Sequence, residues 1–161
     1  MQGNTGKVID VDLTGRSVKI ASPPDAWYHG YIGGSGLAAR LFWEMAHFDA
    51  DPLSPEAILI FMNGPFAGLK LSGASRSSVG GRSPLTGNWG DSSCGGYFGP
   101  ELRYAGYDGI VLRGRTASCV WAGGIRGRHG IEEPKGHRRE LVKETHGSGR
   151  PGAIRETAQR T

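Results

Sequence analysis

The residues best suited to chemistry lie in one glycine-rich stretch between Arg82 and Leu102. The stretch holds five glycines among small hydroxyl-bearing residues, and it ends in the pattern of an amphipathic helix. Glycine lets a backbone approach a ligand closely, because no Cβ atom stands in the way. Successive N–H groups just before a helix attract anions, and the helix dipole reinforces them. The stretch therefore predicts a phosphate-bearing cofactor lying against main chain.

Within this stretch, Asp91 to Gly96 combines a carboxylate, hydroxyl groups and main-chain donors ahead of the expected helix. We expect Gly95 and Gly96 to approach the cofactor through main chain. Ser93 or Cys94 can offer a backbone carbonyl to a Mg²⁺ ion that bridges phosphates. Two alternatives stay open: the segment is an elaborate helix cap, or Cys94 is a nucleophile activated by the helix terminus. The sequence places no histidine near Cys94 to act as its base.

Two arginines, Arg76 and Arg82, flank a segment of small residues just before the glycine-rich stretch. The planar guanidinium fork suits a phosphate or the edge of a pyrimidinone ring. We predict that Arg76 contacts the cofactor. For Arg82 the simpler alternative is a solvated surface side chain.

A second glycine motif, Gly34 to Ala39, matches the GxGxx(G/A) dinucleotide fingerprint, with Glu56 placed 20 residues beyond Gly36. The fingerprint should follow a strand, but residues 28–32 have the pattern of a short helix or turn. Three interpretations stay open: a tight turn packed on a helix, a cofactor contact, and a dinucleotide site.

These motifs require elements that hold them in place. Alternating residues predict a hairpin of strands 7–13 and 17–21, and Asp25 is expected to cap a short helix that ends at Ile32. Apolar spacing predicts a helix over 37–46, and a continuous apolar run predicts a fully buried strand over 57–62. The remaining expected elements are strands 75–81, 108–113 and 117–122 and a helix over 97–104. Hairpins without regular βαβ alternation favour an α+β fold.

Composition narrows the classes of function. Residues 1–116 carry ten basic and ten acidic side chains, so the excess charge belongs to the tail. The two cysteines, Cys94 and Cys119, are too few for an iron–sulfur cluster or a disulfide framework, which favours a cytoplasmic protein. The sequence has no apolar run long enough to span a membrane. The basic tail lacks interleaved aromatic residues, so we do not predict nucleic-acid binding.

Taken in order, the segments above and several others resemble the N-terminal domain of the tungsten-dependent aldehyde ferredoxin oxidoreductases. The resemblance covers about residues 3–116 and places a tungstopterin-binding N-terminal domain, partial in extent, at residues 1–122. A divergent basic, Gly/Arg-rich and poorly ordered tail is expected at residues 123–161. The matching segments are Thr5–Leu13, Tyr31–Leu37, Asp51–Glu56, Gly64–Gly68, Ser83–Gly87, Gly95–Leu102 and Ala105–Asp108.

The resemblance implies a sheet-rich α+β domain of two β/α repeats, the second incomplete. It also implies a bis-molybdopterin cofactor carrying tungsten or molybdenum, with Mg²⁺ between its phosphates. By similarity, Arg76 contacts pterin, and Ser93 and Gly95 contact the phosphates and Mg²⁺ through main chain. Ser93 stands where relatives have asparagine, which matters little if the contact is a backbone carbonyl.

The family oxidises aldehydes to carboxylic acids and passes two electrons to ferredoxin through a [4Fe–4S] cluster. This sequence has no match for the family's later glycine- and arginine-rich pterin segment, the cluster cysteines or the substrate pocket. We therefore expect a fragment or truncated copy that binds the cofactor but is inactive alone, and the change near residue 120 is typical of a shifted reading frame. The resemblance implies contact with remaining domains or another subunit, and a homo-oligomer in the full-length family. The alternatives are a stand-alone pterin-binding or subunit-interaction module and, less favoured, a dinucleotide-binding protein.

Overall fold

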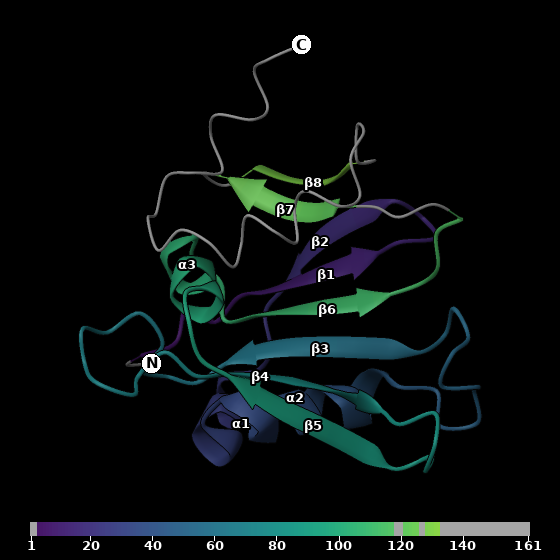
Figure 1. The fold of residues 1–161 in the computed structure, drawn as a ribbon, viewed down its shortest axis with the longest axis horizontal. Helices are drawn as coiled ribbons and strands as arrows, with labels where there is room; N and C mark the ends of the chain where they lie inside the picture. Colours follow the sequence, from purple (N-terminus) through teal and green to yellow (C-terminus); the bar gives the residue numbers. More distant parts are fainter. Residues whose placement is uncertain (1–2, 118–120, 126–127, 133–161) are drawn as a thin grey trace.

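One mixed sheet organises the molecule, with helices on both of its faces (Figure 1). The computed structural model describes residues 3–117, 121–125 and 128–132. Within these residues the sheet has the strand order β2-β1-β6-β3-β4-β5, and β7 and β8 form a separate antiparallel pair. The strands are β1 (Val8–Asp12), β2 (Ser17–Ala21), β3 (Ile58–Asn63), β4 (Ser77–Arg82), β5 (Trp89–Cys94), β6 (Gly109–Arg113), β7 (Trp121–Ile125) and β8 (Arg128–Glu132). The helices are α1 (Asp25–Tyr31), α2 (Gly34–Met45) and α3 (Phe98–Tyr104).

The predicted N-terminal hairpin is confirmed, with Asp12 opposite Ser17 at its turn. The Asp12 carboxylate accepts a hydrogen bond from the Gly15 N–H at 2.9 Å, which closes the turn. β6 then pairs parallel to β1 and antiparallel to β3, so it joins the hairpin to the rest of the sheet. The sequence carries no local signal for this parallel pairing, because its two strands lie about a hundred residues apart.

The α1 and α2 side of the sheet holds the larger apolar core. Leu37, Leu41 and Phe42 lie on one face of α2, as the helical spacing predicts, and pack on Ile60 and Met62 of β3. The helix begins at Gly34, so the glycines form its first turn and do not precede it.

The expected cap of the first helix is wrong. Asp25 is the first residue of α1, and Pro24 occupies the N-cap position without a side-chain hydrogen bond. Proline fixes φ near the value needed to enter a helix, so Pro24 starts α1 where a capping carboxylate was expected.

β3 is buried along one face and only in part on the other, which corrects the expectation of a fully buried strand. Ile58, Ile60 and Met62 face α2 and are buried, whereas Leu59 is 41% exposed. Its face is covered farther along by α3, which packs Leu102 against β1 side chains. A continuous apolar run does not reveal that half of a sheet face lacks a covering helix.

β5 is an element that the sequence did not predict. Its residues are mostly glycine, aspartate and serine, which are poor strand formers, yet all six pair with β4. The Trp89 ring lies directly over Gly80 of β4, where a Cβ atom would come within 2.3 Å of it. The ring also packs on Phe42 of α2, with centroids 4.9 Å apart. Tertiary packing of one aromatic ring therefore holds β5 in the sheet.

The helix over 97–104 and the strand over 108–113 are confirmed to within one residue at each end. Part of the strand expected over 117–122, residues 118–120, lies outside the described residues. β7 and β8 extend past residue 122, where no strand was expected. Most of the expected tail, residues 133–161, lies outside the described residues, and the domain boundary stays a prediction. None of the described helices is long and apolar enough to cross a membrane.

We predict that Gly80→Ala destabilises the fold by about 2 kcal/mol, because the new methyl group displaces the Trp89 ring. Urea unfolding followed by far-UV circular dichroism measures this change. Gly90→Ala in β5 is the matched control, since a Cβ there meets nothing closer than 3.9 Å. Equal stability of the two variants would contradict the role assigned to Trp89.

Candidate functional site

The five predicted site residues lie together at one end of the β4–β5 pair. Ser77 and Cys94 form the last residue pair of the antiparallel β4–β5 ladder at this end. Arg76, which precedes Ser77, and Gly95, which follows Cys94, therefore lie side by side just beyond the paired strands. Arg76 and the whole segment Ser93–Gly96 are exposed. The register of two strands thus places Arg76 beside a segment that follows it by some twenty residues.

The glycine segment leaves its surroundings open to a ligand. A Cβ atom at Gly95 or Gly96 would meet no heavy atom within 4 Å. Gly96 has a φ of +97°, a conformation that L side chains rarely adopt, so the turn from β5 into α3 needs glycine here. Among the described strands, β5 is an edge of the sheet, so alternate main-chain groups along it have no partner strand.

The start of α2 lies on the side of the sheet to which the Ser93 side chain points. The Ser93 hydroxyl is 3.4 Å from the hydroxyl of the buried Ser78. A Cβ at Gly34, the first residue of α2, would lie 3.5 Å from the same Ser78 hydroxyl, and one at Gly33 would come within 2.9 Å of the Asn63 carbonyl oxygen. Glycine is needed here so that the helix can begin against the sheet.

This geometry favours the tight-turn interpretation of the motif Gly34 to Ala39. The element before it is α1, whereas a dinucleotide fingerprint follows a strand. Glu56 precedes β3 while Gly34 lies beside its far end, so the six-residue strand separates them. Such a strand is about 20 Å long, too far for both residues to hold one nucleoside.

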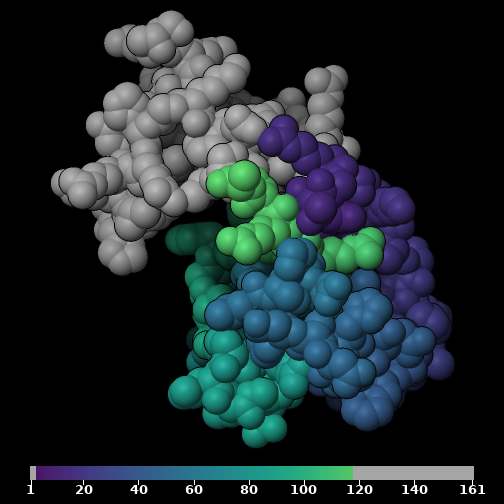
Figure 2. All heavy atoms as spheres, turned by 90° about the vertical axis from the view of Figure 1, so that its right-hand side faces the viewer, coloured from purple at the N-terminus to yellow at the C-terminus, as the bar shows by residue number. Residues whose placement is uncertain are grey.

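Arg82 has a structural role at the other end of β4. Its guanidinium donates hydrogen bonds to the carbonyl oxygens of Gly87, Phe48 and Ala50. It thereby joins the connection between α2 and β3 to the turn before β5, two segments that meet on the side shown in Figure 2. The sequence predicted a cofactor contact for Arg76 and favoured a solvated side chain for Arg82. Only Arg76 lies beside the glycine segment, and Arg82 is held by main-chain carbonyl oxygens.

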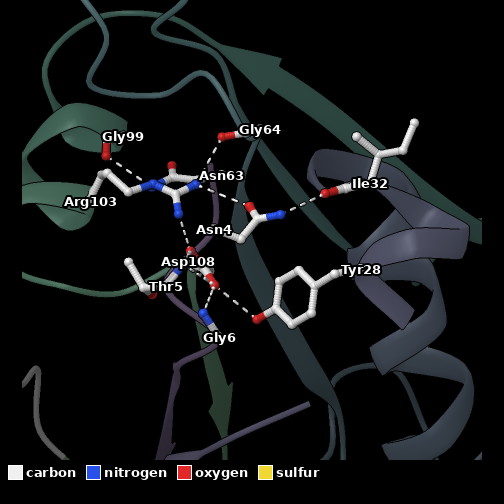
Figure 3. A network of polar contacts seen from close by, with 10 residues as sticks. All are labelled: Asn4, Thr5, Gly6, Tyr28, Ile32, Asn63, Gly64, Gly99, Arg103 and Asp108. Carbon is white, nitrogen blue, oxygen red and sulfur yellow. Dashed lines mark hydrogen bonds and ion pairs between the residues drawn. The ribbon is translucent and has the colours of Figure 1, made fainter. Parts of the chain in front are cut away.

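Asp108 forms a buried polar network close to the site, which sequence reasoning missed. Its side chain is 1% exposed and pairs with the guanidinium of Arg103. It accepts hydrogen bonds from the N–H groups of Thr5 and Gly6 and, at 2.9 Å, from the hydroxyl of Tyr28 (Figure 3). Only the family segment Ala105–Asp108 pointed to this residue, since most of its partners lie far away in sequence.

Arg103 and Asn63 extend this network toward Arg76. Arg103 donates to the carbonyl oxygen of Gly64 at 3.0 Å, and the Gly64 N–H donates to the carbonyl oxygen of Arg76 at 3.2 Å. The Asn63 side-chain amide donates to the carbonyl oxygen of Gly99 in α3 at 2.9 Å. The network therefore contacts the backbone on both sides of the candidate site.

Tyr28 is strongly affected by this network. Burial raises the pKa of its phenol well above the ordinary value, and the charge of Asp108 and the hydrogen bond to it act in the same direction. The hydroxyl therefore stays protonated and can donate to Asp108 throughout the physiological range.

The described residues contain no group of three or more histidine, cysteine or acidic side chains able to hold a metal ion. Cys94 is exposed as a free thiol, and within the described part of the chain no hydrogen bond joins it to a histidine or acidic side chain.

The family model described as the aldehyde ferredoxin oxidoreductase N-terminal domain matches residues 8–123. The chain belongs to this family. It is 38% identical over 121 residues to a tungsten-containing aldehyde ferredoxin oxidoreductase of Pyrococcus furiosus, a match that covers 75% of this chain and 20% of the relative. It is 32% identical over 124 residues to the WOR-like subunit of an aliphatic sulfonate oxidoreductase from the same organism, again covering 75% of this chain and 20% of the relative.

A solved structure shares the fold of this aldehyde ferredoxin oxidoreductase N-terminal domain. It is the active-site complex of benzoyl coenzyme A reductase in complex with 1,5-dienoyl-CoA. The TM-score is 0.79 at 34% identity, over 82% of this chain and 20% of the other. The predicted α+β family fold is therefore confirmed. The chain spans about a fifth of the length of the relatives it matches.

We predict that Asp108→Asn costs this family domain about 4 kcal/mol of stability, because it leaves Arg103 buried without its counterion. Chemical denaturation at pH 7 measures the loss. Asp10→Asn is the control: Asp10 pairs with Arg113 at 2.9 Å, but the arginine side chain is 40% exposed, so the cost stays below about 1 kcal/mol. Similar costs for the two variants would contradict the importance given to Asp108.

The Tyr28 hydroxyl gives a separate pH prediction. At pH 7, Tyr28→Phe loses about 2 kcal/mol, the typical value of a hydrogen bond to a charged group. Above about pH 10 the unfolded chain releases the Tyr28 proton while the folded chain keeps it, so wild-type stability falls with pH. Tyr28→Phe has no phenol at this position, so its stability lacks this loss at high pH. The stability difference between the two proteins should therefore shrink between pH 9 and pH 11, and a constant difference would contradict the raised pKa.

Proposed function

We infer that this chain is the part of a family enzyme that holds a tungsten- or molybdenum-bearing bis-molybdopterin cofactor. The observation that carries the proposal is the meeting of Arg76 with the exposed segment Ser93–Gly96 at one end of β4 and β5. A tungsten-containing relative supports the class of cofactor. The two strands bring a cation and an open main chain to the same place, as a phosphate-bearing ligand requires.

The residues present fit such a ligand. The Arg76 side chain is exposed and has no hydrogen-bond or ion-pair partner among the described residues, so its donors are available for a pterin edge or phosphate. Gly95 and Gly96 admit close approach because no neighbouring atom fills the space a Cβ would take. Arg103, in contrast, is already paired with Asp108.

Mg²⁺ fits the same segment through main chain. It prefers oxygen ligands and is bound by few protein groups alongside phosphates and water. The backbone carbonyl of Ser93 or Cys94 would supply such a ligand, and the change from the family's asparagine to Ser93 leaves a backbone contact intact. The Ser93 hydroxyl is directed instead to Ser78.

The chain's own part in the chemistry is binding and orientation. When bound, the pterin-held metal supplies the two-electron oxidation of an aldehyde to a carboxylate. Arg76 and the backbone of Ser93–Gly96 fix the pterin and its phosphates on the sheet edge. A [4Fe–4S] cluster takes four thiolates, and the sequence holds two cysteines. Electron transfer to ferredoxin therefore needs other domains or another subunit, so we propose that this chain is inactive alone.

The domain is expected to work together with other domains or subunits. Relatives include the active-site complex of benzoyl coenzyme A reductase and a WOR-like subunit, so the domain occurs in larger assemblies. We propose contact with the remaining family domains, supplied by a longer chain or another subunit, and a homo-oligomer in the full-length enzyme. The relatives are named for different substrates, so we propose that this part of the fold does not select the aldehyde. A cytoplasmic location stays a prediction.

The alternative is a stand-alone module that binds pterin or pairs with a subunit without taking part in catalysis. The open segment at Gly95 and Gly96 suits a carrier equally well. Stoichiometric pterin on a monomeric, catalytically inert chain would favour this alternative over the fragment of an enzyme.

We predict that Arg76→Ala lowers pterin occupancy about tenfold, because a charge-assisted contact to a phosphate or pterin is lost. The 161-residue chain is produced anaerobically in a host that makes the bis-pterin cofactor. Pterin per chain is then measured by the fluorescence of its oxidised form.

Lys19→Ala is the matched control, since Lys19 is an exposed cation on β2 at the opposite edge of the sheet from β5. It should keep the wild-type occupancy. Absence of pterin from the wild-type chain, or equal loss in both variants, would contradict the proposed site. Oxidation of aldehydes by the purified chain with a viologen acceptor would contradict its inactivity alone.

A further inference from the structure

A short relay of hydrogen bonds connects Asp108 to the backbone of Arg76. The carboxylate of Asp108 pairs with Arg103, whose Nη2 atom donates to the Gly64 carbonyl oxygen at 3.0 Å. The N–H group of the same Gly64 donates to the Arg76 carbonyl oxygen at 3.2 Å. Gly64 thus accepts a hydrogen bond from Arg103 through its carbonyl oxygen and donates one to Arg76 through its N–H group.

We propose that Arg103 is a positioning residue, which fixes the backbone of Arg76 through Gly64 so that the Arg76 side chain meets the cofactor. This inference rests on the cofactor-binding function proposed above. Arg103 itself does not bind the ligand, because its side chain is only 11% exposed and its charge is matched by Asp108.

The geometry explains why an arginine is needed at position 103. A guanidinium presents several donors in a rigid plane, so one terminal nitrogen reaches Asp108 while the other reaches Gly64. A lysine ammonium in the same place keeps the charge opposite Asp108 but cannot hold both partners in that fixed geometry. Arg103→Lys therefore keeps the ion pair with Asp108 and removes the hydrogen bond to the Gly64 carbonyl oxygen.

A second branch fixes the other side of the site. The main-chain carbonyl of Asp108 accepts a hydrogen bond from the Asn63 N–H at 2.8 Å, and the Asn63 side chain donates to Gly99 in α3. A Cβ at Gly99 would lie 2.9 Å from the Asn63 oxygen and 2.4 Å from the Ser77 hydroxyl oxygen, so the start of α3 sits close against the strands. Hydrogen bonds that start from Asp108 thus help to hold both the backbone of Arg76 and the start of α3.

The first test is hydrogen exchange of the Gly64 amide, which needs no cofactor. We expect Arg103→Lys to accelerate this exchange about fivefold or more, because the Gly64 carbonyl loses the guanidinium donor that holds this residue in place and the adjoining N–H then opens more readily. Tyr28→Phe is the matched control: it weakens the same Asp108 network on the branch toward α1 and should leave Gly64 exchange unchanged relative to neighbouring amides. Equal acceleration in both variants would overturn the proposal, since it indicates a general loosening.

The second test is a double-mutant cycle on pterin occupancy, measured as above. Arg103→Lys should lower occupancy about fivefold in the wild-type background and leave it unchanged in the Arg76→Ala background, because Arg103 acts through Arg76. Additive losses would overturn the proposal. If the wild-type chain carries no pterin, the proposed function fails, while the Gly64 exchange still decides whether Arg103 positions Arg76. Should Arg103→Lys not fold, the double variant Arg103→Gln with Asp108→Asn, which leaves neither charge buried without its partner, takes its place with the same expected changes.

Discussion

The structure depends on one buried carboxylate, Asp108, at the start of β6. It neutralises Arg103 and accepts hydrogen bonds from the N-terminal segment and from Tyr28 of α1. A buried charge is costly unless it is paired and fully hydrogen-bonded, and here nearly every partner comes from a different element. The N-terminal segment, α1 and α3 must therefore all be in place before the carboxylate is satisfied.

This constraint explains why a small sheet with limited helix cover keeps a defined geometry at its open edge. β5 has weak strand formers, and its residues are exposed except for the half-buried Trp89. The Trp89 ring on Gly80 holds one end of that strand, and the start of α3, seated against Asn63 and Ser77, holds the other. The glycine segment between these fixed points is free of neighbours, so it is accessible without being loosely attached.

The sequence predicted the hairpin, α2, α3 and β6 because each has a local pattern: alternation, helical spacing or bounding glycines. It did not predict β5, since strand pairing there is imposed by β4 and by an aromatic ring and not by propensity. It overestimated the burial of β3, because a run of apolar residues does not indicate whether a helix covers the second face of the strand. For the site, it selected the five residues that the structure brings together. It favoured Arg76 over Arg82 as the cofactor contact, but it did not predict that Arg82 binds carbonyl oxygens of two turns.

The amino-acid sequence alone determined the family, the class of fold and the glycine-rich segment, because these depend on residue types at short, fixed spacing. Tertiary structure decided which arginine lies beside that segment, because β-strand register is set by pairing between distant residues. It also decided the roles of Asp108, Arg103 and Gly64. Their contacts join residues up to 103 positions apart, and no local pattern encodes a hydrogen bond across that separation.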